Sequence, residues 1–268
     1  MADGEAMQLY YERDQERDRL EAGLGQLEFI RTIEIVQRTL PAAPAVIADI
    51  GGGPGRYTDW LIDAGYTVIH RDVVPHHVDQ VRAKHGDTVD TAVGDVRSLD
   101  LADASVDAML CLGPLYHLPE EADRRRAIAE AARVTKSGGV LYVAAIGRWA
   151  ARLQGILVDQ LYVETPDAAD RLAETEHTGL IPAIFEGAFT GYTHSPDQLR
   201  SEMDRPDMAL EAIVAVEGPA TMFCDNIVAE RLANNVDRAV LLDCLRAVES
   251  IPDLLGMSGH LLGIAHRV

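Results

Sequence analysis

Short apolar stretches alternate with longer amphipathic stretches through the first half of the chain. Residues 45–50 are apolar and partly β-branched, which is typical of a strand covered on both faces of a parallel sheet. Residues 56–64 then space their apolar side chains along one side of a helix. The pattern therefore predicts a buried strand that runs through a glycine-rich loop into a helix.

The same alternation continues as far as residue 146. The pattern predicts further strands over 66–72, 89–96, 106–112 and 140–146, and helices over 75–85 and 120–134. Strands that alternate with helices indicate an α/β fold with a doubly wound, mostly parallel sheet. The ligand crevice of such a sheet lies beyond the carboxyl ends of its strands.

The two ends of the chain and one internal segment depart from this rhythm. Residues 7–40 are predicted to be helical, with a break at Gly23 and Gly25 and an end at Pro41 and Pro44. Residues 147–197 are too long for a simple connection and are interpreted as a helical insert over the ligand edge. A helix over 196–203, a strand over 210–217, a long helix over 225–249 and a strand over 261–268 follow, and the two strands are expected to form an antiparallel pair at one sheet edge. We therefore divide the chain into a lead-in (1–44), a core (45–146), an insert (147–197) and the end of the core (198–268).

The composition of the chain narrows the classes of molecule that it is expected to bind. The 268 residues carry a formal net charge of −19, which argues against nucleic acid or an anionic membrane and favours a small-molecule substrate. Three scattered cysteines without metal-ligand spacing are expected to be reduced core residues of a cytoplasmic protein. Neither a leader peptide nor a transmembrane stretch is evident, and a homodimer is left open.

The glycine-rich loop at residues 51–55 is the main candidate for ligand binding. Four of its five residues are glycine, so its backbone can turn sharply and approach a ligand closely. A dinucleotide loop needs a third glycine where this chain has Arg56, and no phosphate-binding lysine follows. Asp49 and Asp72 lie about 20 residues apart at the ends of neighbouring predicted strands, where an acid typically binds a ribose. Asp72 as a helix cap or turn residue is the alternative.

Five segments in this order resemble the class I S-adenosylmethionine-dependent methyltransferases. They are ADIGGGPGRY, HRDVVP, VGDVRSL, SVDAMLCLGPLYHL and KSGGVLYVA, and the resemblance covers residues 27–146. The segments LEFIRT, LYHL, GYTHSPDQL and VEGPA are also similar to actinobacterial small-molecule methyltransferases of secondary metabolism. The resemblance implies a seven-stranded Rossmann-like sheet, S-adenosylmethionine as cofactor, and methylation of a small aromatic or heterocyclic metabolite at oxygen, nitrogen or an indole-type carbon.

The resemblance also implies a set of cofactor contacts. Asp72 would bind the ribose diol, Asp95 the adenine amino group, and Arg31 the carboxylate of the amino-acid part. A surface arginine that pairs with Glu28 or Glu34 is the alternative for Arg31. The full predicted cofactor set is Tyr11, Arg31, Asp49, Gly51, Gly53, Asp72, Val73, Asp95, Val96 and Leu112, with Tyr10 as a further lid residue.

Three residues are candidates for chemistry at the acceptor. His117 follows the fourth predicted strand and is a candidate general base, although it could instead pack the loop or touch the cofactor. Tyr192 and His194 lie in the insert and are candidates for substrate contact. His76 and His77 begin a helix and are expected at the surface. No grouping has metal-ligand spacing, so transfer is expected to be metal-independent.

Two other functions stay open at this stage. One is an NAD-type oxidoreductase, and the other is a cofactor-binding relative without catalysis. An aromatic acceptor would need apolar and aromatic walls around its ring. The residues expected to supply them are Trp149, Phe185, Phe189, Tyr192 and Phe223.

Overall fold

The computed structural model describes residues 19–182 and 190–268. The predicted residues Tyr10, Tyr11, Phe185 and Phe189 lie outside these ranges. Among the described residues no helix has the length and apolar character that a membrane crossing requires.

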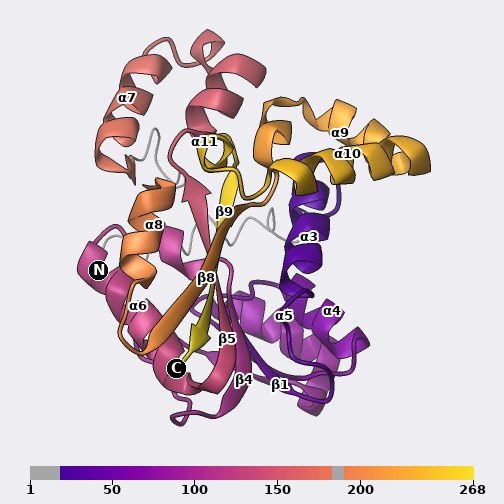
Figure 1. Ribbon diagram of the computed structural model, residues 1–268, viewed down its shortest axis with the longest axis vertical. Coiled ribbons are helices and arrows are strands. Elements are labelled where there is room, and N and C mark those ends of the chain that lie inside the picture. The colour runs from indigo at the N-terminus through magenta and orange to yellow at the C-terminus, as the bar shows by residue number, and fades with distance from the viewer. Residues whose placement is uncertain (1–18, 183–189) are drawn as a thin grey trace.

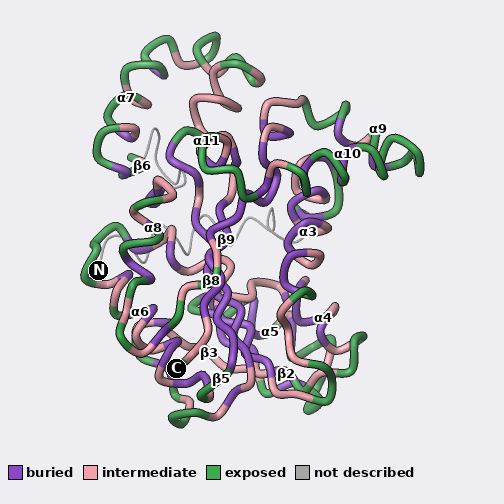
Figure 2. The backbone as a smooth tube through the Cα atoms, in the orientation of Figure 1, coloured by how far each residue is buried: buried purple, intermediate pink, exposed green. Residues whose placement is uncertain are grey.

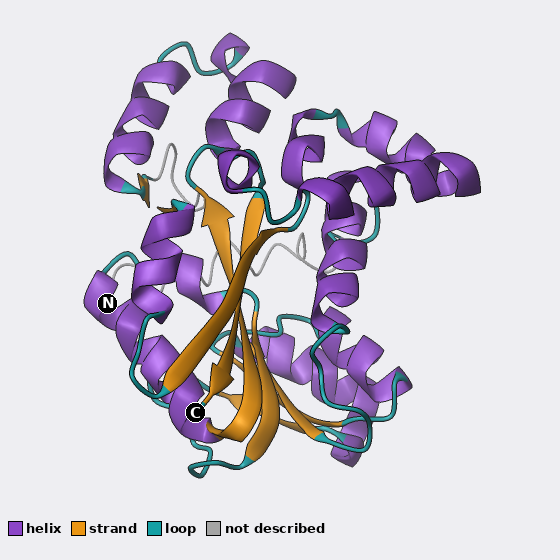
Figure 3. Cartoon of the chain, in the orientation of Figure 1, coloured by secondary structure: helices purple, strands orange, loops and turns teal. Residues whose placement is uncertain are grey.

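A twisted sheet forms the centre of the molecule (Figure 3). Its main strands lie in the order β3–β2–β1–β4–β5–β9–β8, and all run parallel except β9. The predicted seven-stranded, mostly parallel sheet with an antiparallel pair at its edge is thereby confirmed. The strands are β1 Val46–Ile50, β2 Thr67–Asp72, β3 Asp90–Val93, β4 Val106–Cys111, β5 Thr135–Gly147, β6 Leu180–Ile181, β7 Gly191–His194, β8 Met208–Ala215 and β9 His260–Arg267.

Helices cover both faces of this sheet (Figure 1). α3, α4 and α5 pack on one face, while α6 and α8 pack on the other. The helices are α3 Gly23–Val36, α4 Arg56–Asp63, α5 Pro75–His85, α6 Glu121–Val134, α7 Ala168–Thr178, α8 Pro196–Met203, α9 Asp225–Ala233, α10 Asn235–Val248 and α11 Pro252–Leu255. Shorter helical segments are η1 Gly86–Thr88, η2 Pro114–His117, η3 Ala151–Val158, η4 Leu161–Val163 and η5 Gly218–Met222.

The buried residues follow the sheet (Figure 2). β1 and β4 are almost entirely buried because each lies between two other strands and under helices on both faces. This explains why their sequences are continuously apolar and do not alternate. Two core clusters result, one on each face, and together they hold the carboxyl ends of the strands in one plane.

Several boundaries differ from the prediction. The segment 225–249 is two helices, because the side chain of Asn234 caps α10 by accepting bonds from the amides of Val236 and Asp237. Gly23 begins α3 after a non-helical turn at residues 19–22, while Gly25 lies inside that helix. The insert contains η3, η4 and α7 as expected, but it also contributes β7, which pairs with the end of β5. A strand this short carries too little periodicity to be recognised in a sequence.

The prediction that the cysteines are buried core residues is right for Cys111 and wrong for the other two. All three cysteines are free and Cys111 is buried in β4, where burial raises the pKa of its thiol to about 12. Cys224 and Cys244 are exposed. Both lie in segments that mix apolar and polar residues, so the sequence did not distinguish the covered side from the solvent side.

Candidate functional site

A cavity of about 350 Å³ lies beyond the carboxyl ends of β1, β2 and β4. We call it the main cavity. Its position is the crevice that a doubly wound sheet leaves for a ligand. The structure brings nine predicted site residues to its wall, namely Asp49, Gly51, Gly53, Asp72, Val73, Asp95, Val96, Leu112 and His117.

The glycine loop is fixed to the neighbouring strand β2 through both backbone groups of one residue, Gly53. The amide of Gly53 donates to Oδ2 of Asp72 at 2.8 Å, and the carbonyl of Gly53 lies 3.0 Å from Nε2 of His70. Gly53 has a φ of +56°, which only glycine adopts without strain, and a Cβ built there would meet no protein atom within 4 Å. The loop therefore presents a rigid, open backbone surface to the cavity.

Asp72 is held in its charged form. Burial alone would raise the pKa of its carboxyl group, but hydrogen bonds from His77 and from the amides of Val74 and Gly53 outweigh burial and lower the pKa. An ionised carboxylate has further lone pairs beyond those that accept these bonds. Asp72 can thus accept hydrogen bonds from a diol in the cavity.

The pKa of Asp49, at the end of β1, is shifted in the opposite direction. Its side chain is buried and burial raises its pKa. Oδ2 accepts a bond from the Thr58 hydroxyl at 2.7 Å, and a Cβ at position 52 would come within 2.6 Å of the same oxygen. Gly52 must therefore be glycine for the loop to close over Asp49, which gives this acid a role in shaping the loop.

Asp95 is already engaged by its own neighbour. Arg97 binds its carboxylate through the backbone amide at 2.8 Å and through the guanidinium at 2.6 Å, and these bonds lower the pKa of Asp95. Arg97 also pairs with Asp123 of α6 at 2.7 Å. The pair rigidifies the rim of the cavity, and both oxygens of Asp95 accept bonds from Arg97.

His117 lies in η2, directly after β4, with its ring 4.8 Å from that of Tyr116. Burial lowers the pKa of its imidazole to about 4, although the charge of Asp72 acts in the opposite direction. The ring is therefore neutral at physiological pH. A neutral imidazole can accept a proton and does not repel a cationic ligand group.

The structure corrects the prediction for Arg31. This side chain is fully buried outside the main cavity. Its guanidinium pairs with Glu34 at 2.8 Å and also with Glu249, and Nε donates to the carbonyl of Val216. Its donors are directed into the contact between α3 and the end of the chain. Arg31 is hence a structural residue, although its pairing with Glu34 was one of the predicted alternatives.

Tyr192 and His194 are also placed elsewhere. Both are buried in β7 and neither lines the main cavity. The guanidinium of Arg124 lies 3.6 Å from the Tyr192 ring centroid, and His194 lies 3.2 Å from Glu202, which also pairs with Arg124 at 2.8 Å. These side chains fasten β7 to α6 and α8, so their predicted contact with a substrate is not supported.

His77 and Arg56 are two polar residues of the cavity wall that were not predicted as site residues. His77 was expected at the surface but is buried against Asp72, 3.3 Å from Oδ1. Arg56 lies over the Phe29 ring at 4.5 Å, and its buried Nε has no hydrogen-bond partner among the described residues. The sequence did contain a signal for Arg56, because this residue occupies the position at which a dinucleotide-binding loop has its third glycine.

Comparison with known proteins decides the family. The family model of the methyltransferase domain matches residues 48–143, which span the glycine loop, the acids and β4 through most of β5. This segment is a class I methyltransferase domain. An uncharacterized methyltransferase of Mycobacterium tuberculosis is 37% identical over 108 residues, which are 40% of this chain and 42% of that relative. The match thus spans less than half the length of the curated relatives.

Solved structures agree on the fold over most of the chain. A S-adenosylmethionine-dependent methyltransferase from Methanosarcina mazei superposes with a TM-score of 0.59 at 19% identity, covering 87% of this chain and 97% of that one. At this identity the similarity shows the fold alone. It extends the methyltransferase fold beyond the segment that the family model matches.

The wall of the main cavity fits S-adenosylmethionine, the cofactor of this domain family. The ionised Asp72 suits a ribose diol, and Asp95 also lines the cavity, where its contact with an adenine amino group remains a prediction. The open backbone at Gly53 leaves room for a ligand where a side chain would project. The unpartnered Nε of Arg56 offers a buried donor for a carboxylate, which is the role that the sequence assigned to Arg31.

Proposed function

We propose that this protein transfers a methyl group from S-adenosylmethionine to a small-molecule acceptor. The observation that carries the proposal is the hydrogen bond between the Gly53 amide and Asp72. This bond holds the glycine loop and the carboxylate of Asp72 together in one wall of the main cavity. The match of residues 48–143 to the methyltransferase domain supports it.

The cofactor, when bound, supplies a methyl group on a cationic sulfur. The chain has to align the acceptor with that methyl group, exclude water and remove a proton where the acceptor carries one. His117 is proposed for the last task, because it lies on the cavity wall and is neutral. Its low basicity suits an acceptor that loses its proton after methylation, when that proton has become acidic.

The acceptor is proposed to be a small molecule, in line with the net charge of −19. An aromatic or heterocyclic acceptor, methylated at oxygen, nitrogen or carbon, remains a prediction of the sequence. Trp149, Tyr192 and Phe223, the expected wall residues within the described ranges, line neither of the cavities described here. Metal-independent transfer likewise remains a prediction.

A relative that binds the cofactor without transferring its methyl group is the second candidate. A solved structure described as a cyclase shares the fold, with a TM-score of 0.54 at 17% identity over 90% of this chain and 81% of that one. One fold can therefore serve different reactions. An NAD-type oxidoreductase is disfavoured because Arg56 fills the position of the third glycine.

The proposal is tested by methyl transfer itself. The protein is incubated with S-adenosylmethionine carrying a deuterated methyl group and a panel of small amines, phenols and indoles, and products are identified by mass spectrometry. A labelled product that disappears with the Asp72→Ala variant is the expected result. Cofactor binding without any labelled product would favour the non-catalytic relative.

A further inference from the structure

A second cavity, of about 230 Å³, adjoins the main cavity. Arg19 and Glu28 line both cavities, so they form a shared boundary. The remaining wall of the second cavity comes from five separate parts of the chain. Its residues are Ala22, Leu24, Gly25, Gln154, Glu217, Thr221, Asp225, Gly259 and His260.

The second cavity lies near the carboxyl end of β5. His260 begins β9 and is paired with Ile146 near the carboxyl end of β5. The main cavity occupies the crevice beyond β1, β2 and β4. The second cavity therefore continues the same crevice past β5, beneath the insert residue Gln154, where a second substrate can approach the first.

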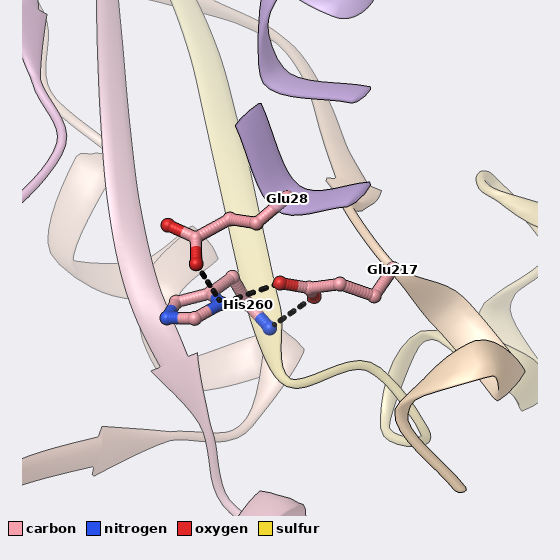
Figure 4. Close-up of side chains that lie close together, drawn as sticks. All are labelled: Glu28, Glu217 and His260. Carbon is pink, nitrogen blue, oxygen red and sulfur yellow. Dashed lines mark hydrogen bonds and ion pairs between the residues drawn. The ribbon is translucent and has the colours of Figure 1, made fainter. Parts of the chain in front are cut away.

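Three ionisable side chains converge on the wall of the second cavity (Figure 4). Nδ1 of His260 lies 2.6 Å from Oε1 of Glu217 and 3.7 Å from Oε2 of Glu28. The other oxygen of Glu217 accepts a bond from the His260 amide at 2.8 Å, which fixes its orientation. A single ring nitrogen thus lies between two carboxylates that come from opposite ends of the chain.

The charges around this cavity sum to an excess of acid. Glu28, Glu217 and Asp225 face Arg19 and His260 across it, and Arg19 pairs with Glu28 at 3.1 Å. Burial alone would lower the pKa of His260, but the charges of Glu28 and Glu217 raise it to about 9. In the absence of a ligand, the imidazolium provides the positive charge that the two carboxylates require.

We propose that the second cavity binds the ammonium group of a small acceptor molecule, with Glu28 and Glu217 as its charge partners, and that the methyl group is transferred to another atom of that molecule, because an ammonium nitrogen has no lone pair. The inference rests on the proposed function, because it names the substrate class of the same crevice. The wall carries three carboxylates against Arg19 and His260, so an ammonium group bound beside the carboxylates compensates the one negative charge in excess.

The test uses benzylammonium chloride as probe and benzyl alcohol as its uncharged counterpart. Both are titrated calorimetrically into the full chain at pH 7.5. Benzylammonium is expected to bind roughly tenfold more tightly than benzyl alcohol, as charge-assisted hydrogen bonds allow. NMR of histidine-labelled protein should show the His260 ring shifting in the same titration.

Matched variants separate this site from general charge effects. Glu217→Gln is expected to abolish the preference for benzylammonium. Glu211→Gln removes a similar Glu–His pair, at 2.6 Å from His266 on the same two strands but exposed, and should leave the preference unchanged. If Glu217→Gln fails to fold, Asp225→Asn at the exposed start of α9 is expected to weaken binding of the ammonium probe while the fold is kept.

Three results would overturn the inference. They are equal binding of the two probes, a preference that survives in the Glu217→Gln variant, and binding of manganese chloride at the three side chains without binding of benzylammonium, since Glu28, Glu217 and His260 could also hold a metal ion. S-adenosylmethionine is titrated in parallel. Loss of cofactor binding with an intact amine site would contradict the proposed function and not the amine site, and the reverse result would contradict the amine site alone.

Discussion

The amide of Gly53 donates a hydrogen bond to Oδ2 of Asp72 at 2.8 Å. The two residues lie on adjacent segments, the loop after β1 and the end of β2, which the parallel pairing of these strands brings together. The bond makes the conformation of the loop depend on the ionised state of the acid. Loop geometry and ligand recognition are therefore coupled in this site.

Gly53→Ala should weaken cofactor binding as well as stability. A left-handed φ of +56° costs an alanine about 1–2 kcal/mol, and the new methyl group would project into the main cavity. Gly138→Ala is the matched control, since Gly138 has a φ of +79° with no neighbour near its Cβ and lies outside the cavity. Chemical denaturation should show similar losses for both variants, and calorimetry should show weaker cofactor binding for Gly53→Ala only.

Arg31→Leu should lower the free energy of unfolding by about 1–3 kcal/mol, because Glu249 loses the fully buried one of its two arginine partners while Arg38 stays paired with it. Cofactor affinity of the folded variant should stay within about threefold of wild type, which is under 1 kcal/mol. Arg82→Leu removes an exposed pair with Asp79 and should cost less than about 1 kcal/mol. A large loss of affinity in Arg31→Leu without loss of stability would restore the role that the sequence assigned to it.

His117→Ala should reduce the rate of methyl transfer about 10²–10⁴-fold if the imidazole removes a proton, with little effect on cofactor affinity. Because the pKa of His117 is lowered to about 4, the wild-type rate should not fall on acidification from pH 8 to pH 6 through protonation of this group. Rates measured across this range at saturating cofactor check the point. A loss of rate and affinity in equal measure would instead make His117 a cofactor contact.

His260 should make stability fall as the pH rises. Its pKa is about 9 in the folded protein and 6.5 in the unfolded chain, so the folded state binds an extra proton between these values. The stabilising contribution is fully present below pH 6.5 and is lost as the pH rises through about 9. Urea denaturation at pH 6 and pH 9 should show a smaller decrease for His260→Asn than for wild type, by roughly 1–3 kcal/mol. An identical decrease in both proteins would contradict the ion-pair cluster.

The sequence predicted those features of the fold and the site that depend on residues close together in the chain. The alternation up to residue 146, the glycine loop and Asp72 are local patterns, and the structure places them together at the main cavity. Arg31 was assigned wrongly because its partner Glu249 lies at the far end of the chain. The cluster of Glu28, Glu217 and His260 has no characteristic spacing, since three distant segments meet only in the folded protein.

The insert was the least predictable part for a related reason. Tyr192 and His194 were proposed as substrate contacts from their position in a presumed lid. In the structure β7 joins the end of β5, and its side chains turn toward Arg124 and Glu202. Packing against α6 and α8 decides which side of this short strand faces a cavity. Four residues are too few for a periodic pattern that would predict this side from the sequence.

Calorimetric titration of S-adenosylmethionine into wild-type protein and the Asp72→Asn variant tests the account most directly. Asparagine keeps the size of the side chain but removes the charge that the ribose diol and the Gly53 amide share. Wild type is expected to bind the cofactor, and the variant is expected to bind it about 10–100-fold more weakly, as the loss of charged hydrogen bonds requires. Absence of binding to wild type, or equal affinity in the two proteins, would contradict the assignment of the main cavity to the cofactor.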